Sequence, residues 1–258
     1  MFEVTDLLDQ PIGIFALALV ALWLVTAAGA YLSALNTKRN EKIPDDFGTI
    51  LGSTLTLSAL IIGFTFSMSI SRYEQRKNCE AVEANSIGTE FSRAELLPHS
   101  DKENVQSLLK LYIEQRIEFY TAASASLALI HARTATLQAR LWASVIGSPP
   151  GRSPAIDALI ISEMNTVLDS EGYAQAAWWN RIPTAAWILM FTIALISQLL
   201  VGFGAHSKLT RLLPMVLPLA VSICFFLIAD IDSPRAGIIR VSPQNLLSVR
   251  DWMNTQPP

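Results

Sequence analysis

The sequence predicts an all-α membrane protein with four transmembrane helices and a large helical domain inserted between the second and the third. Hydrophobic residues make up 51 % of the 258 residues and charged residues only 16 %, whereas soluble proteins carry about 25 % charged residues. The apolar residues are concentrated in windows that contain no Asp, Glu, Lys or Arg. These windows are residues 11–37, 47–71, 182–207 and 212–229. No alternating pattern typical of strands accompanies them.

Each uncharged window has the composition and about the length of a membrane crossing. A helix needs roughly 20 apolar residues to cross a hydrocarbon layer of about 30 Å, and the windows meet or nearly meet this length. Since lipid offers the backbone no hydrogen-bond partner, such crossings must be helical. Glu3, Asp6 and Asp9 precede the first window, where a cleaved signal peptide would need basic residues. We therefore expect the first window to be a retained span.

The windows divide the chain into four parts. Residues 1–71 hold an N-terminal tail and transmembrane helices 1 and 2, residues 72–181 an extramembrane helical domain, residues 182–229 transmembrane helices 3 and 4, and residues 230–258 a C-terminal tail.

Long stretches without Gly or Pro predict the helices outside the membrane. None interrupts residues 64–87, so transmembrane helix 2 is expected to continue beyond the bilayer. A second helix is predicted over residues 101–143, where apolar residues recur at three- and four-residue steps. A third is predicted over residues 154–180, and a short amphipathic stretch over residues 243–253.

The composition excludes several function classes. A net charge of -3 gives no basic patch for a nucleic acid. The histidines (His99, His131 and His206) and the cysteines (Cys79 and Cys224) lack the spacing of a metal site or a catalytic triad. We therefore expect neither a cofactor nor an enzymatic activity.

Five acidic residues follow transmembrane helix 2. We expect them to lie on a solvated face or to form salt bridges between helices, rather than to act as catalytic acids. They are Glu74, Glu80, Glu83, Glu90 and Glu95.

Transmembrane helix 2 carries many hydroxyl side chains, and several of them share one face with two large apolar residues. At 100° per residue, this face spans a sector of about 80°. Its members are Ser53, Thr56, Leu60, Phe64, Ser67 and Ser71. A ring of such helices would form a water-compatible passage with an apolar constriction at Leu60 and Phe64, and apolar constrictions gate ions by dewetting.

The same pattern has a simpler interpretation. Serine and threonine also allow transmembrane helices to approach closely and to hydrogen-bond across the interface, and Leu60 and Phe64 are also suited to packing. The basic residues Arg72, Arg76 and Lys77 could concentrate anions at a pore mouth, or they could anchor a helix end to lipid headgroups. The distribution of basic residues near the spans slightly favours an external position for the helical domain.

The stretch from Ile62 to Lys77 resembles the second span of bestrophins, which are pentameric anion channels. In that family, an apolar helix end containing Gly-Phe leads to an Arg-aromatic pair and a polar run. Residues 83–98, the segment Asp232-Ser-Pro-Arg-Ala-Gly237 and the segment Arg240-Val-Ser242 are similar to a bacterial bestrophin-like group.

The chain also departs from the bestrophin pattern. Tyr73 is followed by Glu74 where bestrophins carry a second aromatic residue, and Thr56 stands where a more apolar neck residue is expected. Asp230 and Asp232 supply two carboxylates, whereas calcium takes six to eight oxygen ligands. The calcium-binding acidic cluster of animal bestrophins therefore has no counterpart.

The resemblance implies a homo-oligomer, with a pentamer favoured, that conducts small inorganic anions such as chloride. It implies a bacterial inner-membrane location among lipids, with the helical domain in the cytoplasm. It places the pore constriction on Leu60 and Phe64, with Thr56 one turn earlier. The hydroxyls of Ser53, Ser67 and Ser71 would then line the pore.

An alternative function is a membrane-anchored sensor or scaffold whose helical domain binds a ligand or a partner protein. The hydroxyl-rich face of transmembrane helix 2 favours the channel, because an anchor needs no such face.

Overall fold

The computed structural model describes residues 10–38, 45–146, 153–205 and 216–256. Helices, turns and loops make up these residues, and no strand occurs among them. The chain divides into two compact units. The first contains residues 1–73 and 181–240, and the second contains residues 74–180 and 241–258. The C-terminal tail is thus divided between the two units.

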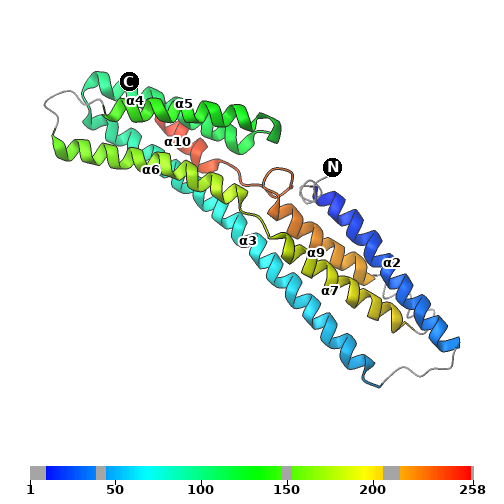
Figure 1. Ribbon diagram of the computed structural model, residues 1–258. Coiled ribbons are helices and arrows are strands. Elements are labelled where there is room, and N and C mark those ends of the chain that lie inside the picture. The colour runs from blue at the N-terminus through cyan, green and yellow to red at the C-terminus, as the bar shows by residue number, and fades with distance from the viewer. Residues whose placement is uncertain (1–9, 39–44, 147–152, 206–215, 257–258) are drawn as a thin grey trace. The chain divides into compact units, whose positions relative to one another are not determined.

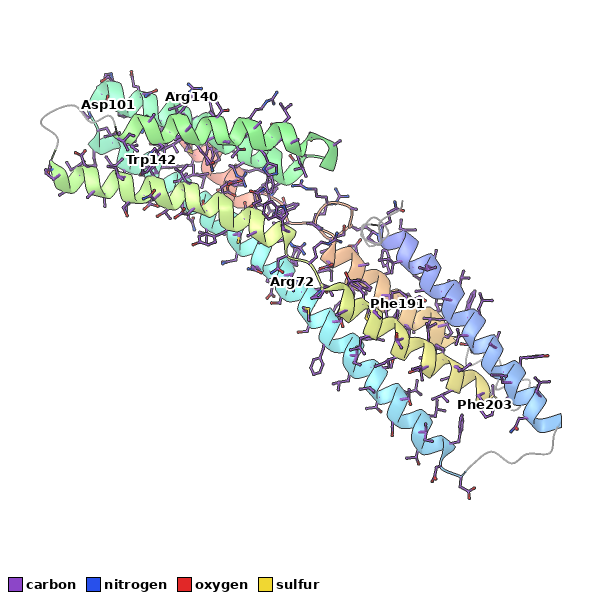
Figure 2. The ribbon with its side chains drawn as sticks, in the orientation of Figure 1. Arg72, Asp101, Arg140, Trp142, Phe191 and Phe203 are labelled. Carbon is purple, nitrogen blue, oxygen red and sulfur yellow. The ribbon has the colours of Figure 1, made fainter. Side chains whose placement is uncertain are left out.

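The first unit is a helical bundle with an apolar core. It contains α2 (Pro11–Lys38), the first part of α3 (Phe47–Arg93), α7 (Thr184–Phe203) and α9 (Val216–Asp232). Helix α2 packs against both α7 and α9, which run beside it in Figure 1. Two aromatic residues of α7 contact the neighbouring helices of the bundle (Figure 2). The ring centroid of Phe191 lies 4.6 Å from that of Phe225 on α9, and the ring centroid of Phe203 lies 5.6 Å from that of Phe47 on α3.

Three stretches contain helices long and apolar enough to cross a membrane, namely Pro11–Asn36, Phe47–Leu96 and Pro154–Phe203. These contain the first three predicted spans. The fourth predicted span corresponds to α9, which is apolar but has only 17 residues in the described part of the chain. Residues 212–215 of that prediction lie outside the described residues. The fourth crossing therefore stays a prediction.

Helices α2 and α7 touch through their backbones. A Cβ atom on Gly29 would lie 2.2 Å from the carbonyl oxygen of Leu199, and one on Gly202 would lie 2.0 Å from that of Thr26. No side chain fits at either position, since real Cβ contacts are far longer. Beside this crossing, the Thr26 hydroxyl lies 3.1 Å from the Gln198 side-chain oxygen. Small residues with a polar contact beside them are typical of tightly packed transmembrane helices.

The turn after α9 is closed by its two aspartates. The Asp230 carboxylate accepts hydrogen bonds from the backbone N–H groups of Ile238 (2.6 Å) and Ile239 (2.8 Å). The Asp232 carboxylate accepts one from the N–H of Ile182 at 3.0 Å, which joins the end of α9 to the residues before α7. A Cβ on Gly237 would lie 2.2 Å from the Asp230 carbonyl oxygen, so the turn requires glycine there. The Asp-x-Pro-x-x-Gly segment is thus part of a structural turn.

The second unit contains the rest of α3, then α4 (His99–Thr121), α5 (Leu127–Ile146), α6 (Pro154–Trp179) and α10 (Gln244–Thr255), with short 3-10 turns at Ala94–Leu96 and Ser124–Ser126. The predicted third helix and the amphipathic stretch of the tail are confirmed as α6 and α10. The prediction of one helix over residues 101–143 is wrong, because α4 and α5 are separate helices that pack side by side (Figure 1).

The helix is interrupted between α4 and α5 although the sequence contains no Gly or Pro there. Ala122 leaves the helix in an extended conformation. The Thr121 hydroxyl donates to the carbonyl of Ile117 at 3.1 Å, and the Ser126 hydroxyl donates to that of Ala123 at 2.9 Å. The Ser126 bond spans three residues and closes the short turn Ser124–Ser126, and local side-chain bonds of this kind favour turns over a continuous helix.

Candidate functional site

The face of α3 that the sequence singles out is exposed in the first unit. Phe64 is 65 % exposed and Leu60 is 51 % exposed, although both lie in a helix of membrane-crossing length. The polar members of the face are exposed as well. They are Ser53, Thr56, Ser67 and Ser71. The helices of the same unit therefore leave this whole sector uncovered.

Three further hydroxyls of the same helix point into the unit. Ser58, Thr65 and Ser69 are buried, and they lie on the opposite side of the helix at 100° per residue. Thr65 donates to the carbonyl of Ile61 at 2.8 Å, and Ser69 donates to that of Phe66 at 2.8 Å. The hydroxyl residues thus fall into two sets, and only the buried set serves packing within the subunit.

The exposed face is polar at both ends and apolar in its middle. The exposed Thr56 hydroxyl donates to the Gly52 carbonyl at 2.9 Å. Leu60 and Phe64 follow one and two turns later, and Leu57 beside them is 47 % exposed. The apolar middle therefore extends over about two turns of α3.

The three basic residues after this face do not share one environment. Arg72 is half-buried in the first unit, whereas Lys77 is exposed in the second. The role of Arg76 at a pore mouth stays a prediction, but its side chain is only 1 % exposed within the single chain. The physical reason is helical spacing, because position 76 falls on the same side of α3 as the buried Ser58 and Ser69.

Three of the acidic residues that follow are buried rather than solvated. Glu80, Glu83 and Glu90 are each at most 1 % exposed, so none of them lies on a solvated face. The other half of the prediction, a salt bridge between helices, is confirmed for Glu83, which pairs with Arg116 of α4. Glu80 caps α10: its carboxylate accepts from the backbone N–H of Leu246 at 2.9 Å and from the Asn245 side chain at 2.6 Å. Negative charge at a helix N-terminus is stabilising.

Glu83 belongs to a buried ion-pair network between α3, α4 and α6. Its carboxylate accepts hydrogen bonds from Arg116 and, at 3.1 Å, from the Tyr120 hydroxyl. Arg116 also lies 3.5 Å from Glu171 and 4.5 Å from the centre of the Phe119 ring. Burial raises the pKa of Glu83, and the neighbouring Arg116 opposes that rise. The network is a structural element of the helical unit.

Glu90 is buried without a partner. Within the described part of the chain, neither of its carboxylate oxygens has a hydrogen-bond partner. Burial, together with repulsion from Glu163, raises the pKa of Glu90 to about 8, although Arg93 opposes the rise. Arg93 instead pairs with Glu163 at 2.6 Å. The Glu90 side chain is therefore mostly protonated at neutral pH.

Sequence reasoning missed one polar residue in the first unit. Gln198 is 1 % exposed and lies in the C-terminal half of the predominantly apolar helix α7. A lone amide in a membrane-crossing window was the signal that could have identified it. Among the described residues, no group of three or more His, Cys, Asp or Glu side chains is arranged to hold a metal ion.

Comparison with known proteins agrees with this architecture. The family model of the Bestrophin-like domain matches residues 12–246 of this chain. No curated protein matches. A crystal structure of a mutated bacterial Bestrophin homolog from Klebsiella pneumoniae superposes with a TM-score of 0.70 at 13 % identity, covering 94 % of this chain and 99 % of that chain. A second structure of the Klebsiella homolog, solved by Zn-SAD phasing, gives a TM-score of 0.69 at the same identity and coverage.

At such low identity the solved structures establish the fold, and the match to the domain establishes the family. That match spans both units, from the start of α2 to the start of α10. The chain therefore belongs to the Bestrophin-like family.

Proposed function

We propose that this integral membrane protein is the subunit of an oligomeric anion channel in which the first part of α3 lines the pore. The observation that carries the proposal is the exposed face of α3, which has hydroxyls at both ends and Leu60 and Phe64 between them. Hydroxyls can replace part of an ion's hydration shell, and an apolar waist can stop conduction by dewetting.

Family membership supports the same function. Bestrophins, which the chain resembles in the Ile62 to Lys77 stretch, are pentameric anion channels, so we favour a homo-pentamer that conducts a small inorganic anion such as chloride. Arg72 and Lys77 would supply positive potential near the pore mouth, which raises the local anion concentration. Selection and gating by these groups require no catalytic residue.

The constriction can be tested by anion flux. In liposomes containing the purified protein, Leu60→Ala and Phe64→Ala should each raise the anion flux several-fold above wild type, because a wider and less apolar waist wets more easily. Ile188→Ala on α7 is the matched control, since Ile188 is an equally large residue with 63 % exposure on another span. Its flux should equal that of wild type.

Flux at the protein-free background for wild type and all three variants would remove the channel function. The alternative, a sensor or scaffold, would then be favoured. A specific feature supports that alternative: α4 and α5 border a groove of about 820 Å³ in the second unit, with Leu111, Glu118 and Arg133 on its walls.

We further propose that the protein resides in a bacterial inner membrane with the helical unit in the cytoplasm, as in bestrophins. Thr136 is exposed on α5 and is suited to test this. With Cys79 and Cys224 replaced by serine, a Thr136→Cys variant should react with a membrane-impermeant maleimide only after the cells are broken. Labelling in intact cells would place the helical unit outside.

A further inference from the structure

We propose that a cavity between α3, α7 and α9 is a binding site for a small aliphatic alcohol dissolved in the membrane. The cavity lies within the first unit and has a volume of about 470 Å³, within the range of roughly 300–1,000 Å³ that is usual for small-molecule sites. Its walls are mostly hydrocarbon, from residues such as Ile62, Phe66, Val221 and Leu227. The wall composition selects an apolar ligand.

The Gln198 amide is the polar group that distinguishes this cavity from a packing defect. Gln198 is 1 % exposed and lines the cavity, and one end of its amide lies 3.1 Å from the Thr26 hydroxyl. No described residue forms a hydrogen bond with the other end. A buried polar group without a partner costs free energy, and a ligand that supplies one would recover it.

A second hydroxyl lines the same cavity. Ser58 on α3 is 6 % exposed, and among the described residues its side chain has no hydrogen-bond partner. Ser197, which also lines the cavity, differs: its hydroxyl donates to the Ile193 carbonyl at 2.8 Å. Gln198 of α7 and Ser58 of α3 therefore remain to recognise a ligand.

The chemistry of these two groups indicates a hydroxyl on the ligand. The Thr26 hydroxyl also donates to the Leu22 carbonyl at 2.8 Å, so its single hydrogen cannot serve both partners fully. Either end of the Gln198 amide can therefore face the cavity. A ligand hydroxyl both donates and accepts, so it satisfies the amide in either orientation, and the Ser58 hydroxyl as well. An alkane can neither donate nor accept, and a carboxylate or phosphate oxygen accepts but cannot donate to the amide oxygen.

Photolabelling tests the site without measuring conduction, so its outcome is independent of the proposed channel function. The purified full-length protein in lipid nanodiscs is irradiated with a diazirine-bearing octanol, and adducts are mapped by mass spectrometry. We expect saturable labelling of cavity residues such as Phe66 and Val221. Unlabelled octanol should compete, whereas octane, which lacks the hydroxyl, should compete about two- to ten-fold less well, as expected for the loss of one or two hydrogen bonds.

Four variants define the recognition groups. Gln198→Leu and Ser58→Ala should each weaken labelling about two- to ten-fold, and Ala220→Leu, which adds volume to the cavity wall, should abolish it. Ser197→Ala is the matched control and should label as wild type, because its hydroxyl is already bonded within its own helix. Equal elution profiles in size exclusion establish that each variant is folded.

Any of four results would overturn the proposal. Labelling that does not saturate and spreads over lipid-exposed residues would indicate partitioning into the bilayer only. Equal competition by octane and octanol, or unchanged labelling in Gln198→Leu and Ser58→Ala, would remove the role of the polar groups. A cavity that resists labelling in the wild type, because a second copy of the chain fills it, would assign the surface to the oligomer interface.

Discussion

The Arg116→Met variant is expected to lose about 3–5 kcal/mol of folding stability, the usual cost of removing one partner of a buried ion pair. The reason is that Arg116 and Glu83 are both fully buried, and the substitution leaves the Glu83 carboxylate with only the Tyr120 hydroxyl as a donor. Since a native domain is stable by only about 5–15 kcal/mol, the helical unit should be partly unfolded at moderate temperature. The measurement is the apparent melting temperature in detergent, followed by fluorescence-detected size exclusion.

Two further variants distinguish the loss of the buried ion pair from a general effect of replacing arginine by methionine. The double variant Arg116→Met with Glu83→Leu should melt at a higher temperature than Arg116→Met alone, because no unpaired buried charge remains. Arg250→Met removes an arginine whose two partners, Asp251 and Glu114, are both largely exposed, and it should melt as wild type. If Arg116→Met melts as Arg250→Met does, the buried pair does not stabilise this unit.

The second large effect concerns Glu90 and pH. Its pKa is about 8 in the folded protein against an ordinary value of 4.5, so the folded state retains a proton that the unfolded state releases. Its contribution to stability is therefore complete below about pH 4.5 and is lost as the pH rises towards and through 8. Glu90→Gln keeps the shape of the protonated side chain without its ionisation. The variant should melt above wild type at pH 8–9, and the difference should vanish near pH 5.

The charged groups around Glu90 are few, which makes the pH profile interpretable. Glu163 of α6 raises its pKa and Arg93 of α3 lowers it, and Lys110 of α4 lies over the neighbouring Phe91 ring. An exposed control, Glu74→Gln, should leave the pH dependence of the melting temperature as in wild type. Parallel profiles for wild type and Glu90→Gln between pH 5 and 9 would show that Glu90 does not retain its proton.

The parts of the fold that the sequence predicts are those set by local composition. Three of the four windows without charges correspond to helices of membrane-crossing length, whereas α9 in the fourth has only 17 described residues. The regular spacing of Ser53, Thr56, Ser67 and Ser71 is sufficient to place them on one face. The structure shows that face exposed, but its role in conduction remains a prediction. Whether a face meets lipid, water or another subunit depends on partners that lie outside a single chain.

The parts that the sequence did not predict depend on contacts distant in sequence or on weak local signals. Glu83 meets Arg116 thirty-three positions later, and nothing near either residue indicates that pairing. The helix break at Ala122 uses only alanine and hydroxyl residues, which helices also tolerate. Burial of Arg76 could have been inferred, because it continues the inward side of α3 marked by Ser58 and Ser69.

The backbone contact between α2 and α7 has a mechanical consequence. With Gly29 and Gly202 in contact with the opposite main chain, neither helix can slide or rotate without a collision of peptide groups, so these two helices form a fixed frame. Helix α3 makes no such backbone contact at Gly52 or Gly63, where an added Cβ atom would meet nothing within 4 Å. A rearrangement of this unit would therefore displace α3 against that frame more readily than it would move α2 against α7.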